Sequence, residues 1–85
     1  MKIERAISVF DKSKDSLIKE INVDILDLYF LKELFGNSTI DDPYNYKPFK
    51  INDFQYEKLQ EIIKELKDYP LSSFELYIEA FQINN

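Results

Sequence analysis

The spacing of the apolar residues changes twice along this chain of 85 residues, and that change constrains the fold more than any motif does. Apolar and polar residues alternate through residues 3–10 and 17–23, and alternation returns in residues 73–83. Alternation places every second side chain on the same face of a β-strand, so we expect three strands at these positions. Between the second and third strands, apolar residues recur every three or four positions, which is typical of helices that pack on a core.

The first helical spacing predicts a helix over residues 27–35. Either Asp24 or Asp27 can cap its start, because a carboxylate there accepts hydrogen bonds from the free N–H groups of the first turn. Gly36 is the only glycine of the chain and follows the last apolar residue of this pattern. Helices commonly end at a glycine in the left-handed conformation, so we assign Gly36 to the helix end.

The second helical spacing predicts a helix over residues 53–67. Asn52 precedes it and Gln55 follows three residues later, which is the spacing of a capping box. Leu59 and Ile63 lie four residues apart on the apolar stripe, so we expect both to be core residues.

Together these elements predict an α+β fold in one domain covering residues 1–85, with the order ββααβ. We expect a three-stranded antiparallel sheet with two helices packed on one of its faces. The other face would carry Tyr77 and Phe81 together with charged residues. Residues 37–50 show no clear period, and we expect Phe49 and Ile51 to dock the end of this segment into the core.

The composition excludes most catalytic and metal-binding chemistry. The chain has no histidine, no cysteine and one glycine, which removes triads with a histidine base, zinc sites and glycine-rich phosphate loops. Asp41 and Asp42 form an adjacent acidic pair, but the alternating acidic residues of a calcium loop are missing. We therefore expect no enzymatic activity, no cofactor and no metal.

The charge of the chain indicates what it can bind and where it acts. Its formal net charge is -5 and its pI is about 4.6. Such a surface repels nucleic-acid phosphates and accelerates encounters with basic proteins. The N-terminus is charged and no apolar run approaches the roughly 20 residues of a membrane span, so we expect a soluble cytoplasmic protein.

A row of acidic residues on the second expected helix is the first candidate for partner binding. Like charges four residues apart destabilise a helix slightly, which favours a surface kept negative for a basic partner. The alternative is a solvated face that Lys58 and Lys64 neutralise. The row consists of Glu57, Glu61, Glu65 and Asp68.

The segment between the two expected helices is the second candidate. It combines two carboxylates with two tyrosines, which supply rigid contact area with a polar tip. The alternative is that one or both rings fold over the edge of the core. Tyr77 and Phe81 on the last strand can form a dimer surface, or this segment can cover them; the sequence leaves both alternatives open. The candidates in the segment are Asp41, Asp42, Tyr44 and Tyr46.

Several segments together resemble a known class of proteins. They are the strand LIKEINVD at residues 17–24, the helix of residues 28–36 that ends in LFG, the sequence DDP at residues 41–43, and the capped helix that follows. In this pattern the chain resembles the small acidic immunity proteins of bacterial contact-dependent growth inhibition and other polymorphic toxin systems. The resemblance implies a cognate toxin domain, often a basic nuclease, as the partner, and it assigns no interface residue.

Our main hypothesis is an immunity protein that neutralises a cognate toxin by stoichiometric occlusion. One alternative is an acidic protein of phage type that mimics the charge of nucleic acid, or a regulatory protein of that type. Another is a structural subunit whose open sheet edge pairs with a second copy. The oligomeric state stays open between a monomer and a weak dimer.

Overall fold

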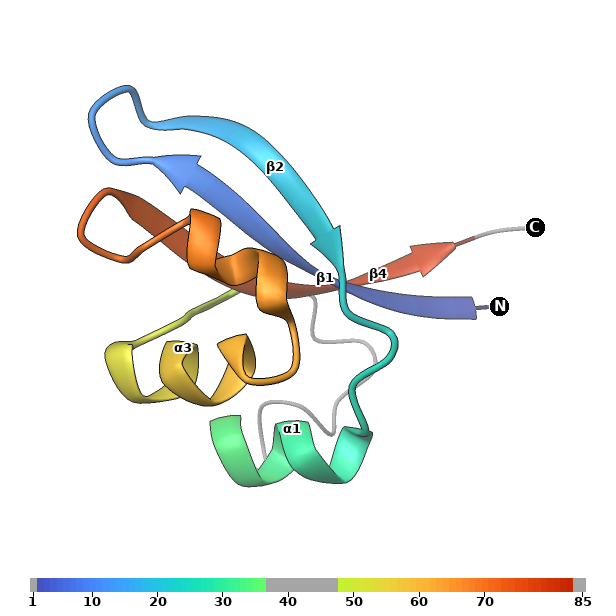
Figure 1. Ribbon diagram of the computed structural model, residues 1–85. Helices are drawn as coiled ribbons and strands as arrows, with labels where there is room; N and C mark the ends of the chain where they lie inside the picture. Colours follow the sequence, from blue (N-terminus) through green and yellow to red (C-terminus); the bar gives the residue numbers. More distant parts are fainter. Residues whose placement is uncertain (1, 37–47, 84–85) are drawn as a thin grey trace.

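The fold is α+β, and its described part has an antiparallel sheet and two α-helices (Figure 1). The computed structural model describes residues 2–36 and 48–83. Its strands are β1 Lys2–Asp11, β2 Ser16–Asn22, β3 Phe49–Lys50 and β4 Phe74–Ile83. Its helices are α1 Leu28–Phe35, α3 Asp53–Gln60 and the 3-10 helix η1 Lys64–Asp68.

The described residues form a sheet of four strands in the order β2-β1-β4-β3, so the prediction of three strands and the order ββααβ was wrong. β1 and β4 pair antiparallel along their whole length at the centre of the sheet. The additional strand, β3, pairs Phe49 with Ile78 and Lys50 with Tyr77. Two residues are too few to show alternation, so no pattern in the sequence indicates this strand. The expected docking of Phe49 and Ile51 is confirmed, since Phe49 packs against the core and Ile51 is buried in it.

The turn between β1 and β2 is held by one carboxylate. Asp11 accepts hydrogen bonds from the backbone N–H of Ser13 at 2.8 Å, from its hydroxyl at 2.6 Å and from the N–H of Lys14 at 3.2 Å. The bonds from Ser13 lower the pKa of Asp11 below its ordinary value, because they stabilise the charged form. Asp15 completes the turn in the left-handed region, with φ 52°. This turn sets the position of Asp15 beside the sheet.

The two candidate caps of the first helix have different roles. Asp27 caps α1 by accepting a hydrogen bond from the N–H of Tyr29 at 2.8 Å. Asp24 instead accepts from the N–H of Arg5 at 2.8 Å and ties the chain after β2 back to β1. Gly36 ends α1 with a positive φ of 97°, but its ψ of 149° lies outside the left-handed helical region.

The capping box at the start of α3 is confirmed. The side chain of Asn52 accepts from the N–H of Gln55 at 2.8 Å, and the side-chain oxygen of Gln55 accepts from the N–H of Asn52 at 3.0 Å. The amide nitrogen of Gln55 also donates to the carbonyl of Leu34 at 3.3 Å. One side chain therefore closes the start of α3 and joins it to the end of α1.

The prediction of one helix over residues 53–67 was wrong, because the segment is divided. α3 ends at Gln60, and Ile63 leaves the helical region with φ -99° and ψ 88° before η1 begins. The turn brings η1 back against α3, where the hydroxyl of Tyr56 donates to the carbonyl of Leu66. Leu59 and Leu66 are both fully buried, whereas Ile63 is only half-buried. The apolar spacing continues through the turn, so periodicity does not reveal the division.

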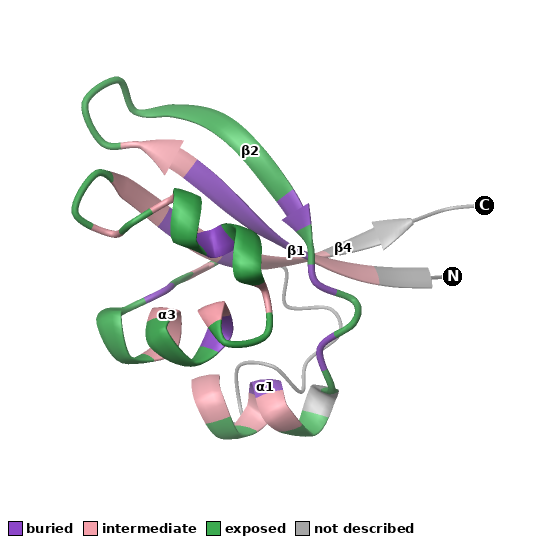
Figure 2. Cartoon of the chain, viewed as in Figure 1, coloured by how far each residue is buried: buried purple, intermediate pink, exposed green. Residues whose placement is uncertain are grey.

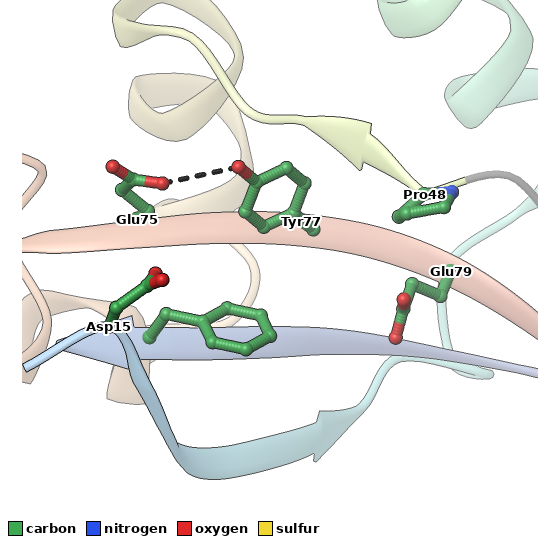
Figure 3. A pocket seen from close by; sticks show the side chains of 6 residues that line it. Asp15, Pro48, Glu75, Tyr77 and Glu79 are labelled. Atoms are coloured by element: carbon green, nitrogen blue, oxygen red, sulfur yellow. Dashed lines mark hydrogen bonds between the residues drawn. The ribbon is translucent and has the colours of Figure 1, made fainter. Parts of the chain in front are cut away.

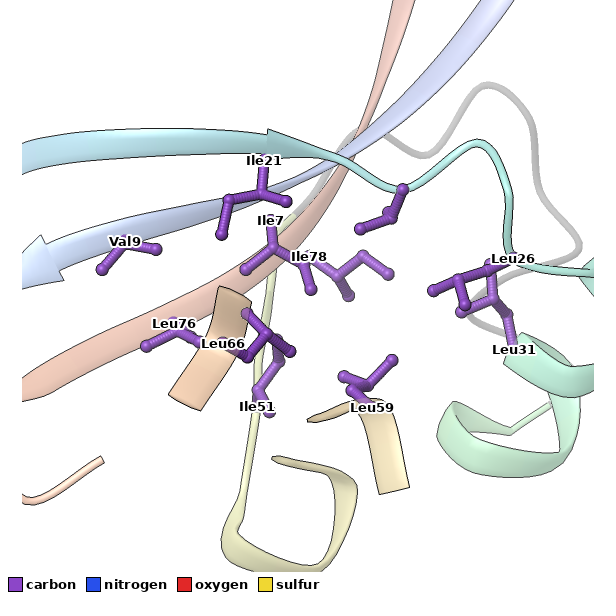
Figure 4. Close-up of a cluster of buried hydrophobic side chains, with 11 residues drawn as sticks. Ile7, Val9, Ile21, Leu26, Leu31, Ile51, Leu59, Leu66, Leu76 and Ile78 are labelled. Carbon is purple, nitrogen blue, oxygen red and sulfur yellow. The ribbon is translucent and has the colours of Figure 1, made fainter. Parts of the chain in front are cut away.

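The core lies between one face of the sheet and the helices (Figures 2 and 4). Figure 1 shows η1, α3 and α1 on the same side of the sheet, with α1 farthest from it. The core residues come from every strand except β3, from the helices and from the segments that join them. They are Ile7, Val9, Ile21, Val23, Leu26, Leu31, Ile51, Leu59, Leu66, Leu76 and Ile78.

Candidate functional site

The second face of the sheet, turned away from the helices, carries the candidate site. We call it the outer face. Alternation along β4 sends Leu76 and Ile78 into the core and therefore sends Glu75, Tyr77 and Glu79 to the outer face. The register of β1 places Phe10 opposite Glu75, Ser8 opposite Tyr77, and Ala6 opposite Glu79. Aromatic rings and carboxylates from two strands are thus brought together at the centre of the sheet.

A hollow of about 200 Å³ lies on the outer face (Figure 3). The rings of Phe10 and Tyr77 meet edge to face, with 5.7 Å between their centroids and 89° between their planes. The hollow is smaller than the roughly 300–1,000 Å³ of pockets that hold drug-sized molecules, so it suits a single side chain. Its lining consists of Phe10, Asp15, Pro48, Glu75, Tyr77 and Glu79.

Two hydrogen bonds hold the glutamates of this hollow in place. The hydroxyl of Ser8, which is only 1% exposed, donates to Oε2 of Glu79 at 2.7 Å. The hydroxyl of Tyr77 donates to Oε2 of Glu75 at 3.1 Å. Each carboxylate uses one oxygen for a hydrogen bond within the protein. Ser8 on β1 holds Glu79, and Tyr77 on β4 holds Glu75. The geometry is therefore set before any partner arrives.

The electrostatics of the hollow favour a cation. Burial raises the pKa of Tyr77, and its hydrogen bond to Glu75 together with the charges of Glu75 and Asp15 raises it further. The phenol consequently stays protonated at neutral pH and remains a donor. Among residues 2–36 and 48–83, no lysine or arginine forms an ion pair with Glu75, Glu79 or Asp15. The negative charge of these groups is thus not neutralised from within that part of the chain.

A second hollow, between α1 and α3, already has a lysine of the chain beside one of its aromatic rings. It has a volume of about 190 Å³ and contains Phe30, Leu34 and Phe54 together with Glu33 and Lys58. Nζ of Lys58 lies 5.8 Å from the centre of the Phe54 ring, so the chain supplies its own cation there. The hollow on the outer face is the better candidate for a charged partner.

The predicted acidic residues of the second helix are divided between two elements. Glu57 lies on α3 and Glu61 is its C-terminal cap, whereas Glu65 and Asp68 belong to η1. All four are exposed. The turn between α3 and η1 breaks the four-residue spacing on which the row was based.

The other predicted candidates lie outside the described residues. They are Asp41, Asp42, Tyr44 and Tyr46. Tyr77, by contrast, lines the hollow, and the side chain of Phe81 is outside the described part of the chain.

Sequence reasoning missed most of the hollow. Alternation along the last strand predicted Glu75, Tyr77 and Glu79 on the face opposite the core, but the two glutamates were not among the predicted site residues. Phe10 and Asp15 join them only through the pairing of β1 with β4, which alternation alone does not specify.

The described residues offer neither a metal-binding cluster nor a membrane-spanning helix. No group of three or more aspartates and glutamates in residues 2–36 and 48–83 is arranged to hold a metal ion. Within the same ranges, no helix is long and apolar enough to cross a bilayer.

The fold and the hollow define a small α+β domain with an acidic, aromatic recess on the outer face of its sheet. The chain belongs to the family described as a domain of unknown function, DUF7683, whose model matches residues 4–79. No curated protein and no solved structure matches the chain.

Proposed function

We propose that this protein is a cytoplasmic immunity protein that binds a cognate bacterial toxin domain, a basic nuclease, and blocks it without catalysing a reaction. The observation that carries the proposal is the hollow on the outer face. Hydrogen bonds hold the carboxylates of Glu75 and Glu79 in place, the aromatic rings are partly exposed, and no lysine or arginine of the described chain neutralises the hollow. A protein surface of this chemistry is suited to bind the cationic groups with which a nuclease holds phosphate.

The charge of the whole chain supports the same proposal. At a net charge of -5, the protein attracts a basic domain over distances of about 10 Å at 0.1 M salt. Such attraction raises the rate of encounter, and the buried aromatic contacts that follow slow dissociation. Occlusion needs no chemistry from the protein, in keeping with a chain that has no histidine and no cysteine. The resemblance to small acidic immunity proteins points in the same direction.

The test is co-expression with the domain encoded immediately upstream of the gene, the position expected for a cognate toxin. Expression of that domain alone should stop growth, and co-expression of this protein should restore it. The purified proteins should form a 1:1 complex in size-exclusion chromatography with light scattering. A toxin domain from an unrelated system is the control and should remain toxic. Failure to restore growth, with both proteins soluble, would contradict the proposal.

One observation favours a second candidate function, a subunit that associates through its sheet. β2 is an edge strand of the described sheet, and Leu17 and Ile18 on it are 48% and 46% exposed. An edge strand with exposed apolar residues can pair with another chain. Sedimentation velocity over a range of concentrations tests this candidate. A dimer that Ile18→Lys converts to a monomer would support it, and a monomer at all concentrations would exclude it.

A further inference from the structure

We infer that the hollow on the outer face receives the guanidinium group of one arginine of the partner. The origin of this arginine in a toxin rests on the proposed function, whereas the affinity of the hollow for a guanidinium does not. The inference specifies which chemical group is recognised and which residues recognise it.

The walls of the hollow suit a flat cation. The Tyr77 and Phe10 rings stand at 89° to each other, so an inserted group can lie on the face of one ring and against the edge of the other. Pro48 adds an apolar wall from the segment before β3. Guanidinium groups are planar, weakly hydrated, and stack on aromatic faces.

The carboxylates surround the position that such a group would take. Figure 3 shows Glu75 and Asp15 to one side of Tyr77 and Glu79 to the other. Ser8 occupies Oε2 of Glu79, and no other described residue donates a hydrogen bond to that carboxylate, so Oε1 can accept one from a ligand. A guanidinium has five N–H donors in a fixed plane and can therefore reach carboxylates on two sides at once.

Arginine fits these features better than lysine does. A lysine ammonium is a compact, strongly hydrated charge that would have to lose water against the aromatic walls. It also has no plane to stack on Tyr77. At about 200 Å³ the hollow holds one side-chain head group, so a single arginine fills it.

The direct test uses N-acetyl-arginine methylamide as the probe and ¹⁵N amide chemical shifts of the full chain as the measurement. The probe should cause saturable shifts at Ser8, Tyr77 and Glu79. The neutral isostere N-acetyl-citrulline methylamide should bind about tenfold more weakly, since charge-assisted hydrogen bonds are lost. The corresponding lysine compound should bind more weakly than the arginine compound.

Variants locate the site on the chain. Glu75→Gln combined with Glu79→Gln should weaken arginine binding by about tenfold. Glutamine still accepts the bonds from Ser8 and Tyr77, so the fold should be retained. Glu33→Gln removes an exposed carboxylate from α1, on the helical side of the sheet, and should leave the affinity unchanged. Circular dichroism and thermal unfolding check that each variant is folded.

Several outcomes would overturn the inference. They are equal binding of arginine and citrulline, shifts confined to the helices, and equal weakening by Glu33→Gln and the double variant. If the double variant did not fold, the arginine–citrulline comparison on the unaltered chain would decide.

The same variants separate this inference from the proposed function. Binding of the probe in the hollow without any binding of the toxin domain would refute the proposed function alone. A toxin domain that binds the double variant as tightly as the unaltered chain would refute the arginine contact alone.

Discussion

The two faces of β4 carry opposite kinds of chemistry on one strand. On the inner face, Leu76 and Ile78 are 0% and 2% exposed and lie among aliphatic side chains under the helices. On the outer face, Glu75, Tyr77 and Glu79 are half-buried and bonded through polar atoms. The inner face therefore supplies the free energy of folding, while the outer face presents a fixed arrangement of charges that folding does not require. This contrast is the basis for assigning the binding role to the outer face.

The largest expected effect is the loss of a core side chain on the inner side. Leu66 is fully buried above the sheet, so Leu66→Ala should lower the free energy of unfolding by about 2–5 kcal/mol. In so small a domain this is a large part of the total stability. Urea denaturation measures it. The matched outer-face change Glu75→Gln should leave the midpoint nearly unchanged. Equal losses would remove the distinction between the faces.

A pair of Tyr→Phe substitutions compares single hydroxyl groups on the two sides. Tyr56→Phe removes the bond that joins α3 to the Leu66 carbonyl in η1 and should cost about 1 kcal/mol. Tyr77→Phe removes the bond to Glu75. Water can reach this carboxylate and replace the lost donor, so the free energy of unfolding should fall by less than in Tyr56→Phe. Thermal unfolding of both variants gives the comparison. A larger loss for Tyr77→Phe would show that the outer-face network stabilises the fold.

Alkaline pH should affect both sides through their tyrosines. Burial raises the pKa of Tyr56 and of Tyr77 above the ordinary 10.0, and the neighbouring carboxylates raise both further. A raised pKa means that the folded state favours the protonated phenol. The contribution of each tyrosine to the free energy of unfolding is therefore complete below pH 10, and it declines as the pH rises through the higher pKa of the folded state. Urea denaturation from neutral pH to about pH 11 should show a decline only above about pH 10. Tyr56→Phe combined with Tyr77→Phe should reduce that decline, and an unaltered slope would contradict the assignment.

The smallest effect is expected from the exposed acidic residues of the helical layer. Glu57→Lys, Glu61→Lys and Glu65→Lys combined should slow association with the toxin domain without unfolding the protein, since all three are exposed. Rising salt should remove the difference, because exposed charges are screened. Stopped-flow kinetics at two salt concentrations measures it. Because the turn after Gln60 divides these residues, a change in the dissociation rate is not expected. A changed dissociation rate would place the interface on the helices instead.

The sequence predicted the elements that depend on local chemistry. β1, β2 and β4 follow from alternation, and the capping box of Asn52 and Gln55 follows from residue spacing alone. The assignment of Tyr77 to the face opposite the core followed from the same alternation along β4.

What the sequence did not predict depends on long-range packing. β3 exists because Phe49 and Lys50 reach β4, and two residues have no period of their own. The turn at Ile63 preserves the apolar spacing on both sides, so a broken helix and a continuous one have the same pattern. The hollow joins Phe10 to Tyr77 across a sequence separation that only the pairing of β1 with β4 closes.

The most direct test of the central claim is the footprint of the toxin domain on the ¹⁵N-labelled protein, measured by amide cross-saturation. If the toxin domain binds the outer face, the amides of Ser8, Tyr77 and Glu79 should be saturated, and those of Glu57 and Glu65 should not. Saturation confined to α3 and η1, with the outer face unaffected, would contradict it.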